Sequence, residues 1–215
     1  PESAELLTAQ FYFWFGAALE RDGHMDRAAE MLMKAIELDP KHPAALNYLA
    51  YSWADRGLHL DRALELVRRA LAEEPDNAAY IDTLGWIYFR QGRLEEALAE
   101  LRRAVEKEPE EPEILDHCGD ALHALGRTAE ALPFWKRAFV FQPDSVPLRE
   151  KLLRHGVDLD PLEREAAAQQ AERERQLRRQ RFEEPDEDGE PPPALPGFDL
   201  SPDELERLNT PDSVP

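Results

Sequence analysis

Cysteine is almost absent from this 215-residue chain, which has only Cys118. A single cysteine excludes an internal disulfide framework and leaves the redox compartment open. Cys118 lies within a helical pattern, at a position that Phe15, Leu49 and Leu84 occupy in similar stretches elsewhere. We therefore expect Cys118 to act as a small buried hydrophobe rather than as a reactive thiol.

Motifs of catalysis are also missing. The sequence has no glycine-rich phosphate loop, no paired-cysteine metal signature and no nucleophile elbow. The nearest approach to a metal site is Asp116, Asp120 and His123, whose spacing of four and three residues would place them on one helix face. A polar helix surface accounts for these residues more simply than a metal does. The chain is predicted to be no enzyme and to bind no metal or cofactor.

Long apolar runs and positive charge are scarce. No stretch of about 18 apolar residues occurs, and the N-terminus lacks the layout of a signal peptide. We predict a soluble chain without membrane insertion. The sequence does not decide between the cytoplasm and the periplasm as its location. Because the chain begins at Pro1 instead of a methionine, we expect a processed product or a portion of a longer protein.

Acidic residues outnumber basic ones, 45 Asp and Glu against 26 Lys and Arg, for a formal net charge of -19. Such a charge argues against nucleic acid and against an anionic membrane surface as partners. A basic or apolar segment of a protein fits better.

What the chain does have is an internal repeat. Pro40, Pro75, Pro109 and Pro143 are 35, 34 and 34 residues apart. An alanine stands 12 residues and another 5 residues before each proline, and a glycine recurs with nearly the same period. The matched residues are Ala28, Ala63, Ala97 and Ala131, then Ala35, Ala70, Ala104 and Ala138, then Gly23, Gly57, Gly92 and Gly126.

This pattern predicts a helical hairpin repeated along an axis. Each glycine follows an amphipathic stretch and can end a helix at positive φ, and each proline marks the end of the second helix. Seven residues before each glycine is a small residue, which we expect to face the first alanine of the next helix so that the two helices approach closely. These small residues are Gly16, Ala50, Gly85 and Gly119. One hairpin cannot bury its own apolar face, so the units should stack into a solenoid.

The spacing and small-residue code resemble the tetratricopeptide repeat of bacterial proteins, over roughly residues 3–144. The resemblance implies an all-α right-handed solenoid of four hairpins, at about 9–42, 43–77, 78–111 and 112–145. The family's first signature position is Tyr12, Leu46, Ile81 and Leu115 here, each large and mainly apolar where the family usually has tryptophan. The second copy has one extra residue between Gly57 and Ala63, which predicts a longer turn.

Taken in order, the chain predicts a solenoid over 3–143, a capping helix within 144–157, a charged helix over 160–182 and an acidic, proline-rich disordered tail over 183–215. Within the solenoid, helices are expected at 3–21, 25–38, 43–56, 60–73, 77–90, 94–107, 111–124 and 128–141. Five consecutive aromatic residues, from Phe11 to Phe15, point all round the first helix. Either another repeat precedes this helix or it is a loosely covered end of the solenoid.

The resemblance also implies a concave groove that binds a peptide or helix of a partner. In the family, groove contacts come from the residue three before the small one and from those one, four and five after it. The matching residues here are Asn47, Tyr51 and Asp55, Asp82, Trp86, Phe89 and Arg90, and Asp116, Asp120 and His123. These positions include no lysine, which argues against a clamp for a C-terminal carboxylate.

These features favour a non-catalytic protein–protein interaction scaffold. Two alternatives stay open: a structural or oligomerising module of a larger envelope or secretion assembly, and a regulatory part of an enzyme whose catalytic domain is absent. The tail contains a short apolar segment with Phe198, Leu205 and Leu208. This segment is either a spacer with a nascent turn or a docking motif for a partner.

Overall fold

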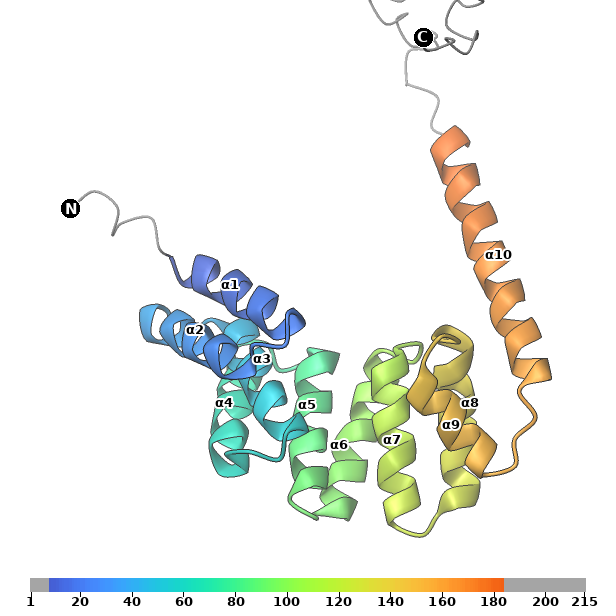
Figure 1. Ribbon diagram of the computed structural model, residues 1–215, viewed down its shortest axis with the longest axis horizontal. Helices are drawn as coiled ribbons and strands as arrows, with labels where there is room; N and C mark the ends of the chain where they lie inside the picture. Colours follow the sequence, from blue (N-terminus) through green and yellow to red (C-terminus); the bar gives the residue numbers. More distant parts are fainter. Residues whose placement is uncertain (1–7, 184–215) are drawn as a thin grey trace, which may run out of the picture. The chain divides into compact units, whose positions relative to one another are not determined.

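The computed structural model describes residues 8–183, with side chains for residues 8–179, and every regular element in this part of the chain is an α-helix. The helices are α1 Ala9–Arg21, α2 Met25–Leu38, α3 Pro43–Asp55, α4 Leu60–Glu73, α5 Ala78–Arg90, α6 Leu94–Lys107, α7 Pro112–Ala124, α8 Thr128–Phe141, α9 Val146–Arg154 and α10 Asp160–Glu183 (Figure 1). The helices predicted between residues 25 and 141 agree with these bounds to within one residue at each end.

The first eight helices pair into four hairpins, and each hairpin turns at a glycine of the repeat. Gly92, for example, has φ 75°, a conformation that a residue with a side chain rarely adopts. Three residues separate the two helices in three of the hairpins, whereas four separate α3 from α4. His59 takes up the extra residue with φ 47°, which confirms the predicted longer turn.

Close packing within a hairpin depends on the small residue of its first helix. A Cβ placed on Gly85 would lie 3.2 Å from the carbonyl oxygen of Ala97 but only 2.7 Å from Cγ of Leu101. The sequence predicted that the small residue faces the first alanine of the second helix. The structure confirms this for the backbone carbonyl of Ala97, but the nearest side chain is that of Leu101. The space left by the glycine is filled by the large residue one turn further along the second helix.

Neighbouring hairpins stack because the second helix of one covers the first helix of the next. Ala70 of α4 is buried with Leu46 of α3 and Tyr80 of α5, and Ala104 of α6 is buried with Ile81 of α5 and Ile114 of α7. The second alanine of each repeat thus lies where two hairpins meet, as the pattern predicts.

An arginine ladder strengthens these joints. The residue before the second alanine, in α4, α6 and α8, donates a hydrogen bond to the carbonyl of the proline that ended the preceding repeat. The pairs are Arg69 with Pro40 at 2.6 Å, Arg103 with Pro75 at 3.3 Å, and Arg137 with Pro109 at 2.6 Å. This regularity follows the repeat period, but sequence reasoning missed it.

The short helix α9 caps the stack by burying Leu148 and Leu152 against α8. By register α9 is the first helix of a fifth hairpin, but Leu153 stands where the other first helices have glycine or alanine. A leucine there keeps a second helix from approaching closely.

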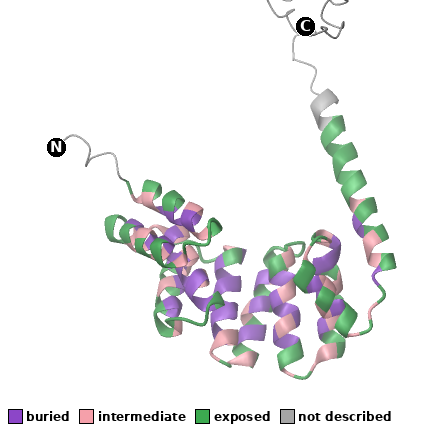
Figure 2. Ribbon diagram, in the orientation of Figure 1, coloured by how far each residue is buried: buried purple, intermediate pink, exposed green. Residues whose placement is uncertain are grey.

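The chain divides into two compact units, Pro1–Gln169 and Gln170–Pro215, so that α10 begins in the first and ends in the second. The described side chains of α10 are mostly exposed, as Figure 2 shows in green, although Ala166 is buried. The predicted disordered tail and its residues Phe198, Leu205 and Leu208 lie outside the described residues.

Candidate binding groove on the inner face

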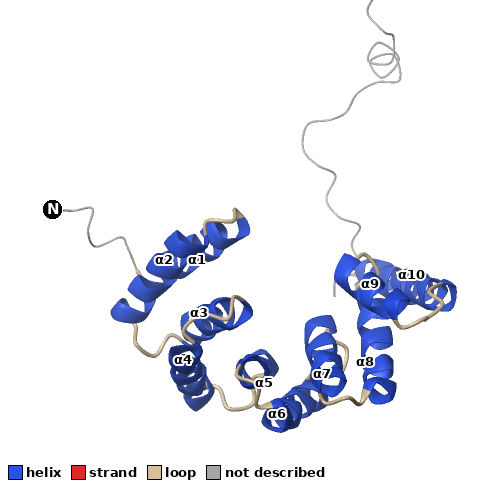
Figure 3. Ribbon diagram, turned by 60° about the horizontal axis from the view of Figure 1, so that its bottom comes forward, coloured by secondary structure: helices blue, strands red, loops and turns tan. Residues whose placement is uncertain are grey.

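The first helices of the hairpins, α3, α5 and α7, line the inner side of the curved stack, and α4, α6 and α8 form its outer side (Figure 3). The predicted groove residues come from α3, α5 and α7. The structure brings some of them to the same cavities and holds others in contacts within the chain.

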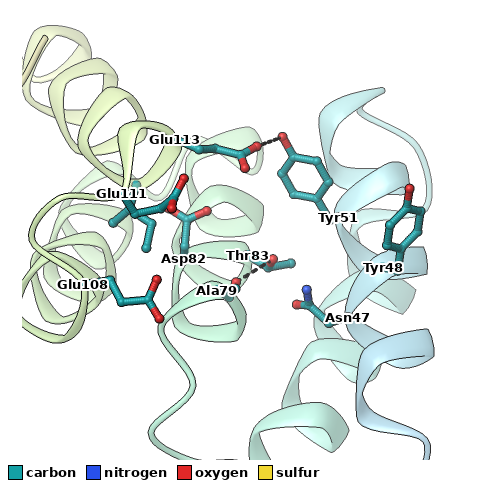
Figure 4. A pocket seen from close by; sticks show the side chains of 10 residues that line it. Asn47, Tyr48, Tyr51, Ala79, Asp82, Thr83, Glu108, Glu111 and Glu113 are labelled. Atoms are coloured by element: carbon teal, nitrogen blue, oxygen red, sulfur yellow. Dashed lines mark hydrogen bonds between the residues drawn. The ribbon is translucent and has the colours of Figure 1, made fainter. Parts of the chain in front are cut away.

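A cavity of about 320 Å³ lies between α3, α5 and the start of α7. In Figure 4 the carboxylates of Glu108, Glu111 and Asp82 lie on one side of this cavity, and Asn47 and Tyr51 lie on the other. We call this the acidic cavity. Of the predicted groove residues, Asn47, Tyr51 and Asp82 line it. The prediction missed Glu108, Glu111 and Glu113, which also line it, because they come from the turn before α7 and from its first residues.

A second cavity, of about 430 Å³, adjoins the acidic cavity and is lined by Asp116, His117 and Leu148 among others. The two cavities share Tyr51, Glu111 and Glu113. The inner face is therefore hollowed by two adjoining cavities between α3 and α9.

One polar atom of the acidic cavity is left without a bond inside the chain. The side-chain oxygen Oδ1 of Asn47 is buried, and among the described residues it has no hydrogen-bond partner. Thr83, in contrast, satisfies its hydroxyl by donating to the carbonyl of Ala79 at 2.9 Å (Figure 4). An unsatisfied buried acceptor is costly, so a turn of the Asn47 side chain toward the cavity, where a partner's donor could reach the oxygen, would be favoured.

The glutamates of the cavity experience burial and one another's charge. Burial raises the pKa of Glu111, and the charges of Glu113, Glu108 and Asp82 favour the same direction. The phenol of Tyr51 donates a hydrogen bond to Glu113, while burial and the Glu113 charge raise the pKa of Tyr51. A positive charge placed among these groups would relieve the repulsion between the carboxylates.

A buried His117–Asp82 pair joins α5 to α7 beneath these cavities. Nδ1 of His117 lies 2.9 Å and 3.1 Å from the two carboxylate oxygens of Asp82. Burial lowers the pKa of His117, but the charge and hydrogen bond of Asp82 outweigh it, so that the pKa is raised overall. Asp82 is only 4% exposed.

Trp86, which was predicted as a groove contact, is largely covered within the chain. Its indole is only 8% exposed and is stacked between two rings, with centroids 4.0 Å from His117 and 4.8 Å from Phe89. The guanidinium of Arg90 lies 5.8 Å from the same indole and donates a hydrogen bond to the carbonyl of Asp55. Asp82, Trp86, Phe89 and Arg90 therefore hold α5 to its neighbours through contacts within the chain, although the buried Nε1 of Trp86 has no hydrogen-bond partner among the described residues.

The cap supplies the lysine that the groove positions lack. Lys151 of α9 donates hydrogen bonds to both Asp116 and Asp120, and Asp120 also accepts one from Trp135 Nε1 at 3.0 Å. Burial and the charge of Asp120 raise the pKa of Asp116, and Lys151 opposes that rise. The contact of these aspartates with a partner stays a prediction, and in the folded chain the single charge of Lys151 offsets one of their two charges.

The structure also shows where His123 and Cys118, two weaker candidates from the sequence, lie. His123 accepts or donates a hydrogen bond with the hydroxyl of Thr128 at 2.9 Å, and in the described part of the chain no three His, Cys, Asp or Glu side chains converge as a metal site would require. Cys118 is fully buried, as expected, and burial raises the pKa of its thiol to about 11.

Comparison with known families supports the assignment of the repeats in two separate stretches of the solenoid. Two models, each described as tetratricopeptide repeat, match residues 9–42 and residues 59–117. Both stretches of the chain are tetratricopeptide repeats. A search of curated proteins gave no significant match.

Solved structures share the tetratricopeptide fold. TTC0263, a thermophilic TPR protein of Thermus thermophilus, is 25% identical over 77% of this chain and 89% of its own, with a TM-score of 0.62. MamA from Desulfovibrio magneticus RS-1 is 21% identical over 66% of this chain and 80% of its own, with a TM-score of 0.55. Cut9–Hcn1, a part of the APC/C, gives 18% identity over 72% of this chain and 31% of its own, with a TM-score of 0.61.

The tetratricopeptide repeats support a scaffold for protein–protein interaction, and this family implies protein partners. The family is in general non-catalytic. None of the helices in residues 8–183 is both long and apolar enough to cross a membrane.

Proposed function

We propose that the acidic cavity binds a peptide or helix of a partner protein and that a Lys or Arg side chain of this ligand enters among Glu108, Glu111 and Glu113. The observation that carries the proposal is the crowding of carboxylates, those of Glu108, Glu111, Glu113 and Asp82, around one cavity. The carboxylates attract the cation, and Asn47 accepts a hydrogen bond from the ligand, for example from a backbone N–H.

The ligand's site differs from the one predicted from the family positions. Asn47 and Tyr51 remain part of the proposed contact, whereas Trp86, Asp116 and Asp120 support it from beneath. Since the carboxylates at the rim are exposed, their attraction for the ligand should weaken as salt is added.

The test is selection of random peptides on the immobilised full-length chain, followed by titration of enriched peptides against variants. Lys or Arg should recur among the enriched peptides. The Glu108→Gln, Glu111→Gln double variant should weaken their binding by about tenfold or more, as loss of charge-assisted contacts does. Asn47→Ala should weaken it further.

A matched control removes two carboxylates elsewhere on the surface, with Glu95→Gln and Glu106→Gln, both on exposed positions of α6. This control should keep the affinity of the native chain. Enriched peptides that bind the native chain and the cavity variants equally well would exclude the acidic cavity as the binding site.

A further inference from the structure

The N-terminal edge of the stack exposes large apolar side chains of α1. Phe11 is 46% exposed, Phe15 38% and Trp14 63%. Within the described residues α1 packs mainly on α2, its own hairpin partner. The outward face of α1 is therefore apolar and uncovered in this part of the chain.

The repeat itself shows what the same face does elsewhere. By register, Phe11 corresponds to Ala45, Tyr80 and Ile114, which are 0%, 7% and 2% exposed. Phe15 corresponds in the same way to Leu49, Leu84 and Cys118, all buried. For Tyr80 and Ile114, residues of the second helix of the preceding hairpin pack around the side chain.

The covering helices have a common chemistry. Ala70 and Leu71 of α4 pack around Tyr80, and Ala104 and Val105 of α6 pack around Ile114. An alanine allows the close approach of the two helices, and the large aliphatic residue beside it fills the remaining space. Each covering helix then ends within a few residues, at a proline whose carbonyl accepts the arginine of the ladder.

A second observation concerns Lys34. It occupies the position of Arg69, Arg103 and Arg137, which donate to the last proline carbonyl of the repeat before them. In the first hairpin the ammonium of Lys34 lies 5.6 Å from the Tyr12 ring. A cation is thus positioned where the carbonyl end of a preceding helix would lie.

We propose that Phe11, Phe15 and Lys34, here called the α1 edge, bind an amphipathic helix of a partner protein in the arrangement that α4 takes on α5. This helix presents an alanine followed by a large aliphatic residue to Phe11 and Phe15. Its C-terminal carbonyls accept hydrogen bonds from Lys34. The site is separate from the acidic cavity and does not depend on the proposed function of that cavity.

A second copy of the chain is a poor source for this helix. Of the described second helices, α2, α4, α6 and α8 already use the corresponding face to cover α3, α5, α7 and α9. The helix α10 has Leu177 as its large exposed hydrophobe and otherwise presents mainly charged side chains. With a second copy disfavoured, we assign the helix to a partner protein.

The experiment uses a helix of known fit as the probe. A fluorescein-labelled peptide with the sequence of residues 94–109, which is α6 with its terminating proline, is titrated into the full 215-residue chain and followed by anisotropy. Because an isolated helix of this length is marginal, Glu95 and Ala99, both exposed in the chain, are replaced by a hydrocarbon staple. The control peptide carries Ala104→Glu and Val105→Glu.

Saturable binding of the first peptide, and loss of binding by the control peptide, is the expected result. The variant Phe11→Glu, Phe15→Glu should weaken binding by about tenfold or more, and Lys34→Glu should weaken it as well. Leu153→Glu, which changes an exposed hydrophobe at the other end of the stack, should leave binding unchanged. Circular dichroism confirms that each variant is folded.

Two results would overturn the proposal. One is the absence of saturable binding, or binding that is equal for the native chain and Phe11→Glu, Phe15→Glu. The other is a concentration-dependent dimer of the chain alone, seen by light scattering and abolished by the same two substitutions. That dimer would show that a second copy covers the α1 edge.

Discussion

At the scale of residues, the hairpins are held by pairs whose sizes compensate. Gly16, Gly85 and Gly119 face Leu32, Leu101 and Trp135, and an added Cβ would press on each of these side chains. The second hairpin has Ala50 instead, and the residue in the matching position is the smaller Val67. One methyl group gained on the first helix is offset by volume lost on the second.

This compensation predicts that Gly85→Ala destabilises the fold by about 1–3 kcal/mol through overpacking against Leu101. Alanine favours a helix by about 1 kcal/mol over glycine, so the steric cost must exceed that gain. Adding Leu101→Val, which copies the Ala50 and Val67 pair, should restore much of the loss. Urea unfolding of the two single variants and the double variant measures the coupling between the sites.

If the two substitutions act additively, Gly85 and Leu101 do not share the space that the structure assigns to them. Leu98→Val in α6, at a buried residue that is not among the atoms nearest to the added Cβ, provides a control for simple loss of volume.

At the scale of elements, α5 and α7 are joined by the buried pair of Asp82 and His117, with Trp86 stacked on the imidazole. The two charged partners are 35 residues apart and so come from successive repeats. A buried pair of this kind is sensitive to the loss of either charge, because the remaining group is left unpaired in a low-dielectric region.

The pair predicts a pH dependence of stability. The pKa of His117 is raised in the folded chain, whereas in the unfolded chain it should lie near about 6.5. The stabilisation is therefore fully present below the unfolded pKa and is lost as the pH rises through the folded pKa. Urea unfolding at a series of pH values should show a decline with rising pH that is absent from His117→Gln.

His24→Gln, at an exposed position, serves as the control and should keep the pH dependence of the native chain. The same slope in the native chain and in His117→Gln would mean that other groups cause the dependence.

At the scale of the whole stack, each hairpin packs mainly against its neighbours, so stability is local as well as global. The cap α9 protects α8 through Leu148 and Leu152. The hairpin α1–α2 lies at the opposite end of the stack, so a change at the cap should have little effect on it.

Replacing Leu152 by Asp should consequently loosen only the α8–α9 end of the stack. A carboxylate in place of a fully buried leucine has no partner there, and its desolvation opposes docking of α9. Hydrogen exchange followed by mass spectrometry should show amides of α8 and α9 exchanging about tenfold faster or more, with α1 and α2 unchanged.

The adjacent Leu153→Asp, at a residue 55% exposed, should leave the pattern of the native chain. Uniformly faster exchange from α1 to α9 in Leu152→Asp would mean that the stack unfolds as one unit.

Much of the fold could be predicted from spacing because its determinants are local. The prolines, the two alanines and the glycine of each repeat mark helix ends and crossings, and these features recur without reference to distant residues. The extra residue before Ala63 predicted a longer turn in the same way, and His59 takes it up. The partners of the crossing glycines were only half predicted, because the volume at Leu101 or Trp135 acts across two helices.

The groove was harder to predict because the family positions identify which residues face inward and not which of them are already engaged. Trp86 faces inward but is covered by His117 and Phe89. Asp116 and Asp120 also face inward, but the cap brings Lys151 to them. Glu108 and Glu111 were missed because they lie between helices, where the repeat pattern is weakest.

The sequence by itself determined the repeat, the hairpin boundaries and the acidic character, since these depend on periodicity, turn chemistry and charge along one stretch of chain. Only the tertiary structure decided which inner-face groups are free and which edge is uncovered. Pairs such as His117 with Asp82 and Lys151 with Asp120 form between residues 31 or more positions apart. Their partners depend on how the helices stack, because a side chain's availability depends on its neighbours in space.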